Sequence, residues 1–278
     1  MNGTAINLGF VGAGRMAQAI GRGIAGSSGI AEMPARFFDP DDAAAGGFST
    51  GHPDAIRVAS AAELAGQCRL LVLAVKPQVM PEVLADLQPV VESGHLVVSV
   101  AAGVTLATLG QRLSTERLIR AMPNTPCLIG RGMTALAAAP AASAADRERV
   151  RIMFDAVGDV VEVDESRIDA VTGLSGSGPA YVFSFIESLI AGGVEAGLEE
   201  SLARQLALQT VLGAGQLMRA TGKSAAELRH QVTSPGGTTL AGLEALHQAG
   251  FARAVTAAVS AATHRAGELA EQAGRSAI

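Results

Sequence analysis

The sequence predicts an α/β protein in which an N-terminal parallel-sheet domain is followed by an all-α domain. Three observations lead to this prediction. Short apolar runs typical of buried strands recur up to residue 163 and then stop. A glycine-rich turn follows the first of these runs, and from Ile168 onward the apolar spacing is helical. We therefore expect two domains, residues 1–164 and 165–278.

Length and composition exclude several classes of protein. A chain of 278 residues can bury a large core and form two domains. The net charge of −5 and the lack of a basic cluster argue against nucleic acid or a membrane surface as a partner. Cys68 and Cys127 lie far apart without metal-ligand spacing, so we expect a reducing cytoplasm and no metal site. The N-terminus lacks the pattern of a signal peptide. The longest apolar helix carries Glu187 and Glu195, which argues against a membrane-spanning helix.

The first predicted strand, Ile6 to Val11, leads directly into the glycine-rich turn. Gly12, Gly14 and Ala17 give the pattern G-x-G-x-x-A, and a helical apolar pattern follows. Gly12 allows a tight reversal, Gly14 allows close approach of a pyrophosphate, and Ala17 lets the helix pack close to the strand. The turn predicts a Rossmann-type dinucleotide site, with a purely structural turn as the alternative.

An acidic residue, Asp39, ends the next strand-like segment, Ala35 to Phe38. In that position a carboxylate accepts hydrogen bonds from the ribose hydroxyls of NADH and repels the 2′-phosphate of NADPH. No basic residue directly follows Asp39. Asp39 therefore favours NADH.

Three later strands end in unusual residues, and such ends form the ligand-binding edge of a parallel sheet. Asn124 and Thr125 lie between two prolines, where they can present a donor and an acceptor to a nicotinamide carboxamide or simply form a rigid turn. The strands are Leu70 to Val75, Leu96 to Val100 and Leu118 to Ala121, followed by Lys76-Pro77, Ala101-Ala102 and Met122 to Pro126. Ile56 to Ala59 is a weaker predicted strand, and Met133 to Ala138 and Val160 to Val163 are two further ones. Helices are predicted at Ala61 to Gly66, with Ser60 as its N-cap, and at Ala145 to Val157.

The C-terminal half predicts five helices, and two of them are apolar on more than one face. Tyr181 to Val194 and Leu202 to Leu217 show this pattern. Because a domain of about five helices cannot bury two such helices by itself, we expect an intertwined homodimer. The predicted helices are 179–196, 201–220, 224–231, 238–248 and 252–272.

The loop before helix 238–248 has the composition of an anion site. Two glycines can turn backbone N–H groups inward, and three hydroxyl groups add donors at a helix start, which suits a small carboxylate. A helix cap is the alternative. The residues are Ser234, Gly236, Gly237, Thr238 and Thr239. A second glycine-rich segment, Leu174 to Ala180, is expected to serve helix packing near the site.

Five motifs occur in order over nearly the whole chain. They are VGAGRMA at 11–17, LAVKPQ at 73–78, AMPNTP at 121–126, IDAVTGLSGSGPAY at 168–181 and VTSPGGTT at 232–239. Together these motifs resemble the pyrroline-5-carboxylate reductase family. This resemblance implies reduction of the cyclic imine of 1-pyrroline-5-carboxylate with NADPH or NADH, the last step of proline synthesis. It also implies a homodimer, often built into a ring of dimers.

The resemblance also implies roles for single residues. Thr239 takes the place of the family's hydroxyl beside the ring nitrogen of the substrate, and Glu165 matches an acidic residue near the substrate. The pyrophosphate is held by Gly12, Ala13, Gly14, Arg15 and Met16; the cofactor is lined by Ala74, Val75, Lys76, Pro77, Ala101 and Ala102; Asn124 and Thr125 lie beside the nicotinamide. The substrate carboxylate is held by Ser234, Gly236, Gly237, Thr238 and Thr239, with Gln231 where an asparagine is frequent.

Other departures are His247, where an acidic or amide residue is usual, and Ser60-Ala61, where an asparagine often contacts the ribose. Two alternatives keep the dinucleotide site: a reductase of a related cyclic imine acid, and a non-catalytic dinucleotide sensor. A β-hydroxyacid dehydrogenase needs a lysine on the first long helix of its second domain, and Pro179 to Leu198 contains none.

Overall fold

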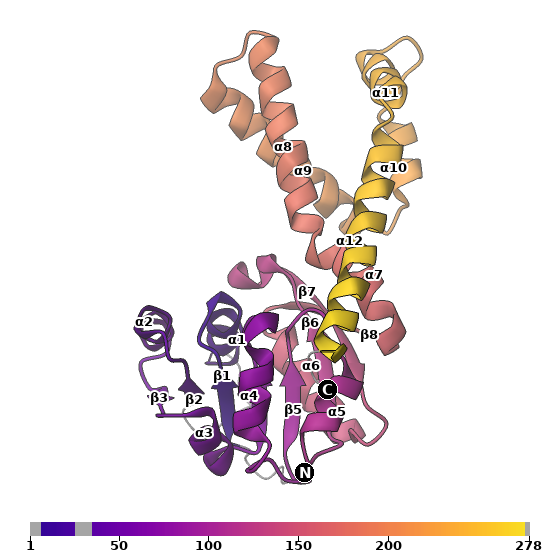
Figure 1. The fold of residues 1–278 in the computed structure, drawn as a ribbon. Coiled ribbons are helices and arrows are strands. Elements are labelled where there is room, and N and C mark those ends of the chain that lie inside the picture. Colours follow the sequence, from indigo (N-terminus) through magenta and orange to yellow (C-terminus); the bar gives the residue numbers. More distant parts are fainter. Residues whose placement is uncertain (1–6, 26–34, 276–278) are drawn as a thin grey trace. The chain divides into compact units, whose positions relative to one another are not determined.

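The computed structural model describes residues 7–25 and 35–275 (Figure 1). Within them, eight strands form one sheet in the order β3-β2-β1-β4-β5-β6-β7-β8. Ile6, at the start of the first predicted strand, lies outside the described residues. The strands are β1 (Leu8–Val11), β2 (Arg36–Phe38), β3 (Ile56–Arg57), β4 (Leu70–Leu73), β5 (Leu96–Ser99), β6 (Leu118–Met122), β7 (Gly132–Ala138) and β8 (Gly158–Glu162).

The sheet is parallel from β3 through β6, but its last two strands run the other way. β7 pairs antiparallel with β6, and β8 pairs parallel with β7. A parallel neighbour needs a long crossover, whereas β6 and β7 are joined by only the short segment around η2 (Thr125–Ile129). The short connection therefore reverses the chain, and the sheet is mixed where the sequence predicted a parallel one.

Strand β1 lies between β2 and β4, so the strand order changes direction at this point. From β1 the chain continues to β2 on one side of β1, and it later returns to β4 on the other side. Such a switch point leaves a crevice at the carboxyl ends of the strands, where ligands of open α/β sheets bind. The glycine-rich turn that follows β1 lies at this edge.

Helices cover both faces of the sheet. Helices α1, α2 and α6 pack on one face, and α3, α4 and α5 pack on the other. The helices of this part are α1 (Arg15–Ala25), α2 (Asp42–Gly51), α3 (Ala61–Gln67), η1 (Pro77–Val79), α4 (Met80–Leu87), α5 (Leu106–Arg112), α6 (Ala144–Asp155), η3 (Glu165–Arg167), α7 (Ile168–Val171) and the π-helix η4 (Thr172–Gly176).

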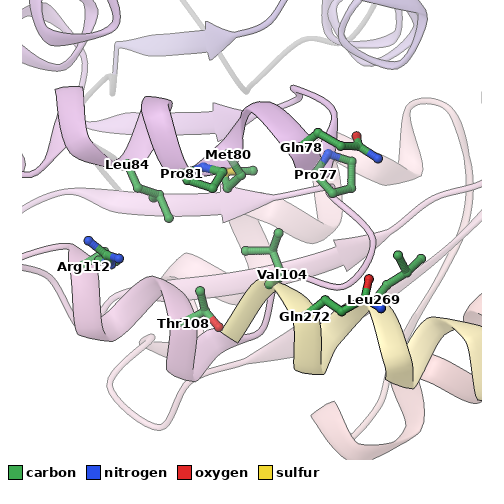
Figure 2. Close-up of a pocket in the computed structure, with 11 residues that line it drawn as sticks. Pro77, Gln78, Met80, Pro81, Leu84, Val104, Thr108, Arg112, Leu269 and Gln272 are labelled. Atoms are coloured by element: carbon green, nitrogen blue, oxygen red, sulfur yellow. The ribbon is translucent and has the colours of Figure 1, made fainter. Parts of the chain in front are cut away.

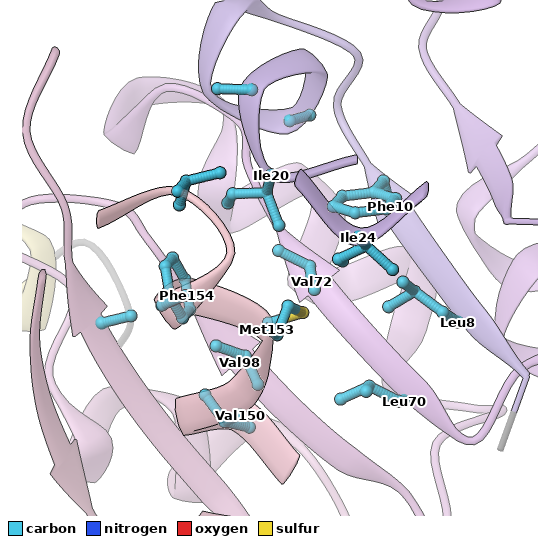
Figure 3. Close-up of a cluster of buried hydrophobic side chains, with 14 of the residues drawn as sticks. Leu8, Phe10, Ile20, Ile24, Leu70, Val72, Val98, Val150, Met153 and Phe154 are labelled. Carbon is cyan, nitrogen blue, oxygen red and sulfur yellow. The ribbon is translucent and has the colours of Figure 1, made fainter. Parts of the chain in front are cut away.

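The core follows from strand alternation. In β4, Leu70 and Val72 face α1 and α6, while Leu71 and Leu73 face α3 and α4. Figure 3 shows the buried cluster on the α1 and α6 face of the sheet, in which side chains of the strands meet those of α1 and α6. All four β4 side chains are buried, and each such burial contributes roughly 1.5–3 kcal/mol. Hydrophobic runs without alternation, as in β4, are expected for a sheet covered on both faces.

Helix α2 forms in a segment that is polar and rich in glycine. Asp41 caps it by accepting hydrogen bonds from the Ala43 and Ala44 N–H groups. Phe48 anchors the helix, since its ring is fully buried against Phe37, at 4.6 Å between ring centroids. One aromatic side chain thus holds an otherwise polar helix on the sheet.

Contacts divide the chain into two compact units. One comprises the described residues up to Ser177 together with those from Ser260 on, and the other comprises Gly178–Val259. The predicted domain boundary between residues 164 and 165 stays a prediction. The helices of the second unit are α8 (Gly178–Glu195), α9 (Glu200–Thr221), α10 (Ala225–Gln231), α11 (Thr238–Gln248) and the first part of α12 (Phe251–Arg275).

The second unit buries little of its own apolar surface. In α9 only Ala203 and Ala207 are buried, and α8 and α11 contain no buried residue. Helix α8 contacts α12 through Phe185 and Phe251, whose ring centroids lie 5.9 Å apart. A helical unit that leaves its large apolar side chains exposed needs a partner surface to cover them.

The two cysteines are free and buried in the first unit. Burial raises the pKa of the Cys68 thiol to about 11, against a smaller lowering by Arg36. Burial likewise raises the pKa of Cys127. Both thiols therefore stay protonated near neutral pH and are poor nucleophiles.

Candidate functional site

The glycine-rich turn has the geometry that a dinucleotide requires. Gly12 has a φ of 95°, and a Cβ there would lie 2.8 Å from the carbonyl oxygen of Ala74. A Cβ on Gly14 would meet nothing within 4 Å, so the space beside this residue is open. Helix α1 follows at once, and its first turn contains no acidic residue. The open space at Gly14 and the helix N-terminus fit a pyrophosphate.

Asp39 is tied directly to this turn. Its Oδ2 atom accepts a hydrogen bond of 2.7 Å from the Ala13 N–H, and its Oδ1 atom accepts one of 2.9 Å from the Asp41 N–H. The Gly12 N–H donates to the Phe38 carbonyl at 2.8 Å. The end of β2 is therefore fixed to the turn after β1, and the half-buried Asp39 lies beside that turn. A carboxylate in this place suits a ribose with free hydroxyl groups.

The other predicted cofactor residues of the sheet lie along the same edge. The Ala74 N–H donates to the Val11 carbonyl at 2.8 Å, which places the end of β4 beside the turn. Val75 and Pro77 are half-buried there and Lys76 is exposed. After β5, the Ala101 N–H donates to the Ser99 hydroxyl at 3.3 Å, and Ala102 follows. Arg15 is exposed and Met16 half-buried at the start of α1.

Asn124 holds the end of β6 to two neighbouring segments. Its Oδ1 atom accepts a hydrogen bond of 2.8 Å from the Met133 N–H, and its Nδ2 atom donates to the carbonyl and hydroxyl oxygens of Ser175 at 3.2 and 3.3 Å. A Cβ on Gly176 would approach Met122 Cε to 2.6 Å. The segment Ser175-Gly176 thus packs on the end of β6, as expected of a packing glycine. Thr125 is exposed beside it.

Glu165 belongs to a charged network at the start of α5. Its Oε1 atom accepts a hydrogen bond of 2.7 Å from the Leu106 N–H and lies 3.5 Å from Arg120 Nη1. The Arg120 side chain is 4% exposed, and its Nη2 atom lies 3.6 Å from Asp169 Oδ1. These last two atoms are buried and face each other as a long ion pair. Glu165 therefore links the segment after β8 with the start of α5 and with β6.

The predicted substrate loop lies in the second unit. Gly236 has a φ of 70°, and the Gly237 N–H donates to the Ser234 carbonyl at 3.1 Å, which closes a turn. Gly237 is the N-cap of α11, and no side-chain hydrogen bond caps this helix start. By contrast, α10 is closed by a capping box of Ser224 and Glu227. The start of α11, with Thr238 and Thr239 exposed in its first turn, thus fits a carboxylate. Gln231 ends α10 and is exposed.

A separate pocket of about 220 Å³ lies between α4, α5 and the last turns of α12 (Figure 2). Pro77 is the one predicted site residue in its lining. Leu84, Val104 and Leu269 make it mainly apolar, and Arg112 lies at one end in Figure 2. The pocket is therefore formed mainly by helices, and it shares only Pro77 with the predicted site.

Other classes of site are not seen in the described part of the chain. No group of three or more histidine, cysteine, aspartate or glutamate residues there could hold a metal ion. Among residues 7–25 and 35–275, no helix combines the length and the apolar character needed to cross a membrane.

Sequence reasoning missed two residues that hold predicted site residues in place: Arg120, which contacts Glu165, and Ser175, which bonds Asn124. Arg120 interrupts the apolar strand β6, and a charged residue in a buried strand is a signal that could have found it. Ser175 carries no such signal, because its role depends on Asn124 lying opposite. The π-helix η4 that contains Ser175 is itself typical of functional sites.

Two protein families match different parts of the chain. Residues 165–269 match the family described as pyrroline-5-carboxylate reductase dimerisation, and residues 7–103 match the family described as NADP oxidoreductase, coenzyme F420-dependent. The mouse protein pyrroline-5-carboxylate reductase 3 is 40% identical over 271 residues, covering 95% of this chain and 96% of its own. The Synechocystis pyrroline-5-carboxylate reductase is 46% identical over 210 residues, covering 76% and 78%.

Solved structures agree. A Plasmodium falciparum pyrroline carboxylate reductase with NADP bound superimposes with a TM-score of 0.84 at 32% identity, covering 95% of this chain and 98% of that one. A Coxiella burnetii pyrroline-5-carboxylate reductase gives 0.87 at 32% identity, covering 96% and 99%. Relatives of this identity and coverage, together with the turn after β1 and the helical unit, show that the chain belongs to the pyrroline-5-carboxylate reductase family.

Proposed function

We propose that this protein reduces 1-pyrroline-5-carboxylate to L-proline with a reduced nicotinamide dinucleotide, the last step of proline biosynthesis. The observation that carries the proposal is the 40% identity to a named reductase over 95% of the chain. The open space at Gly14 and the uncapped start of α11 support it, because the reaction needs one site for a pyrophosphate and one for a carboxylate.

The dinucleotide would be held along the ligand edge of the sheet, at the carboxyl ends of the parallel strands. Gly12 to Met16 would bind the pyrophosphate, Ala74 to Pro77 and Ala101-Ala102 would line the cofactor, and Asn124 and Thr125 would lie beside the nicotinamide. When bound, the reduced nicotinamide supplies the hydride that ends on the imine carbon. Since both ends of the Asn124 amide bond Ser175 and Met133, we assign Asn124 to shaping the wall and Thr125 to contact.

The substrate would be held by the loop of the second unit. Ser234, Gly236, Gly237 and Thr238 would bind its carboxylate through hydroxyl and backbone N–H groups, with Gln231 nearby. Thr239 would donate a hydrogen bond to the ring nitrogen, which makes the imine carbon a better electrophile and fixes its position. Glu165, held by the Leu106 N–H and by Arg120, would be the acidic residue near the substrate.

Cofactor choice follows from Asp39. Its carboxylate is oriented by the Ala13 N–H at 2.7 Å, in the position that accepts from ribose hydroxyls. We propose that NADH is preferred, although a relative of known structure has NADP bound. The other finer proposals are a location in the cytoplasm and a ring built from homodimers. No nucleic acid, membrane or metal is part of the proposal.

The test is the rate of NADH and NADPH oxidation by the purified protein with 1-pyrroline-5-carboxylate. We expect turnover with both and a higher kcat/KM for NADH. A related six-membered cyclic imine acid is assayed in parallel. Cofactor binding without turnover of either imine would replace the reductase with a dinucleotide sensor.

The role of Thr239 is tested by Thr239→Ala. We expect kcat to fall about a hundredfold, the usual contribution of a positioned proton donor, with the Kd for NADH unchanged. Thr239→Ser, which keeps the hydroxyl, is the matched control and should retain most activity. Stopped-flow rates and fluorescence titration measure the two quantities. An unchanged kcat in Thr239→Ala would remove Thr239 from the mechanism.

A further inference from the structure

Arg57 lies beside Asp39, although 18 residues separate them in the chain. Strand β3 pairs with β2 in the register Phe37 to Arg57, which brings the arginine to the end of β2. Its Nη2 atom donates to the Asp39 carbonyl oxygen at 2.8 Å. The basic group that does not follow Asp39 in sequence is therefore supplied by the neighbouring strand.

Asp42 occupies the same guanidinium. Arg57 Nη1 lies 2.8 Å from Asp42 Oδ1, with the two side chains 41% and 91% exposed. Asp42 begins α2, directly after the capping residue Asp41, so its carboxylate lies within the same short segment as Asp39. The end of β2 thus carries three carboxylates and one arginine side chain bound to one of them.

An arginine at the end of β2 is the residue that accommodates a 2′-phosphate in dinucleotide-binding sheets, because its planar guanidinium binds phosphate through two N–H groups. Here Nη1 is bound to the Asp42 carboxylate, while Nη2 donates to the Asp39 carbonyl oxygen. We propose that the Asp42–Arg57 ion pair is a specificity determinant: Asp42 occupies Arg57 and so disfavours a cofactor with a 2′-phosphate. This inference rests on the proposed function, since it requires that the adenosine ribose lie at Asp39.

The proposal separates two effects at this edge. Asp39 acts through its own charge beside the turn, whereas Asp42 acts only through Arg57. Removing the charge of Asp42 should release the guanidinium for phosphate, and this gain should vanish when Arg57 is removed as well. A general change in charge near the ribose would survive the loss of Arg57.

The main experiment measures nucleotide binding, and steady-state kinetics with NADPH accompany it. Calorimetric titration with 2′,5′-ADP and with 5′-AMP compares the wild type, Asp42→Asn, Arg57→Ala and the double variant. We expect Asp42→Asn to bind 2′,5′-ADP about tenfold more tightly, as for one added charge-assisted hydrogen bond. Its affinity for 5′-AMP should change less than twofold, and kcat/KM with NADPH should rise by a similar factor of about ten.

The control is a matched ion pair at the amino-terminal end of the strands, away from the ligand edge. Arg69 and Glu92 lie 3.1 Å apart with side chains 56% and 70% exposed, and Arg69 directly precedes β4. Glu92→Gln removes one carboxylate charge there and should leave both affinities unchanged.

Two results would overturn the inference: an unchanged ratio of the two affinities in Asp42→Asn, or a gain that persists in Asp42→Asn/Arg57→Ala. Absence of binding of either nucleotide to the wild type would overturn both this inference and the dinucleotide site. Failure of the wild type to reduce the imine, with the expected shift in 2′,5′-ADP affinity, would overturn only the reaction.

Discussion

Two glycines of one turn perform different tasks. Gly12 has a backbone conformation that side chains rarely adopt, and the carbonyl of Ala74 occupies the place of its Cβ. Gly14 has neither constraint, because open space lies beside it. Gly12 is therefore required by the packing of β1 against β4, and Gly14 by whatever enters the open space.

This difference predicts opposite results for two substitutions. Gly12→Ala should lower the free energy of unfolding by about 2–4 kcal/mol, from left-handed strain and the clash with Ala74. Gly14→Val should change it by less than about 0.5 kcal/mol but weaken NADH binding roughly a hundredfold. Urea unfolding and fluorescence titration measure the two quantities. Wild-type affinity in Gly14→Val would mean that the pyrophosphate binds elsewhere.

At the scale of an element, helix α6 shows how a buried charge is held. The Asp146 side chain is 2% exposed and bonds two nitrogens of the Arg117 guanidinium. Asp146 also forms a capping box with Ser143, in which each residue accepts from the N–H of the other. Burial by itself would raise the pKa of Asp146, but the bonds from Arg117 and Ser143 outweigh burial and lower the pKa below 3.8.

A lowered pKa in the folded state ties stability to pH. The folded protein favours the charged form of Asp146, so its contribution is complete above pH 3.8 and is lost as the pH falls through the folded pKa. Asp146→Asn should be about 3 kcal/mol less stable than the wild type at pH 7, and this gap should narrow below pH 3.8. Urea unfolding between pH 7 and pH 3 measures the gap.

Asp155→Asn is the control for this prediction, because Asp155 forms an ion pair with Arg151 that is about 40% exposed at both side chains. Exposed pairs contribute little, so a change within about 1 kcal/mol is expected. A gap for Asp146→Asn that stays constant down to pH 3 would contradict the assigned cause of the lowered pKa.

At the scale of the whole molecule, the second unit leaves large apolar side chains on its surface. Phe183 on α8 is 60% exposed, and Leu206 and Leu212 on α9 are 49% and 50% exposed. The dimerisation family matches this part of the chain, so the exposed faces of α8 and α9 are the surface expected to meet a second copy.

A charge placed on this surface should separate the dimer. Leu212→Glu buries two carboxylates in a two-fold interface, and we expect the dimer Kd to rise at least roughly a hundredfold. Ala85→Glu adds the same charge to an exposed position of α4 and should leave the dimer intact. Analytical ultracentrifugation compares them. An unaltered sedimentation profile for Leu212→Glu would place the interface elsewhere.

Features that depend on neighbours in the chain could be predicted from the sequence. Apolar runs located the strands β4, β5 and β6 to within two residues, because a strand covered on both faces needs only apolar side chains. The turn with Gly12 and Gly14 was predicted for a similar reason, since its pattern is short and its physical demands are local. The helices of the second half were predicted from their period alone.

Features that depend on distant segments could not be predicted in this way. The position of Arg57 beside Asp39 depends on the register of β3 with β2, and the bonds of Asn124 depend on Ser175. The sequence by itself thus determined the elements, the turn and the family, because these follow from local chemistry. Only the tertiary structure decided which side chains meet at the ligand edge, because strand order and register bring together residues that no local pattern relates.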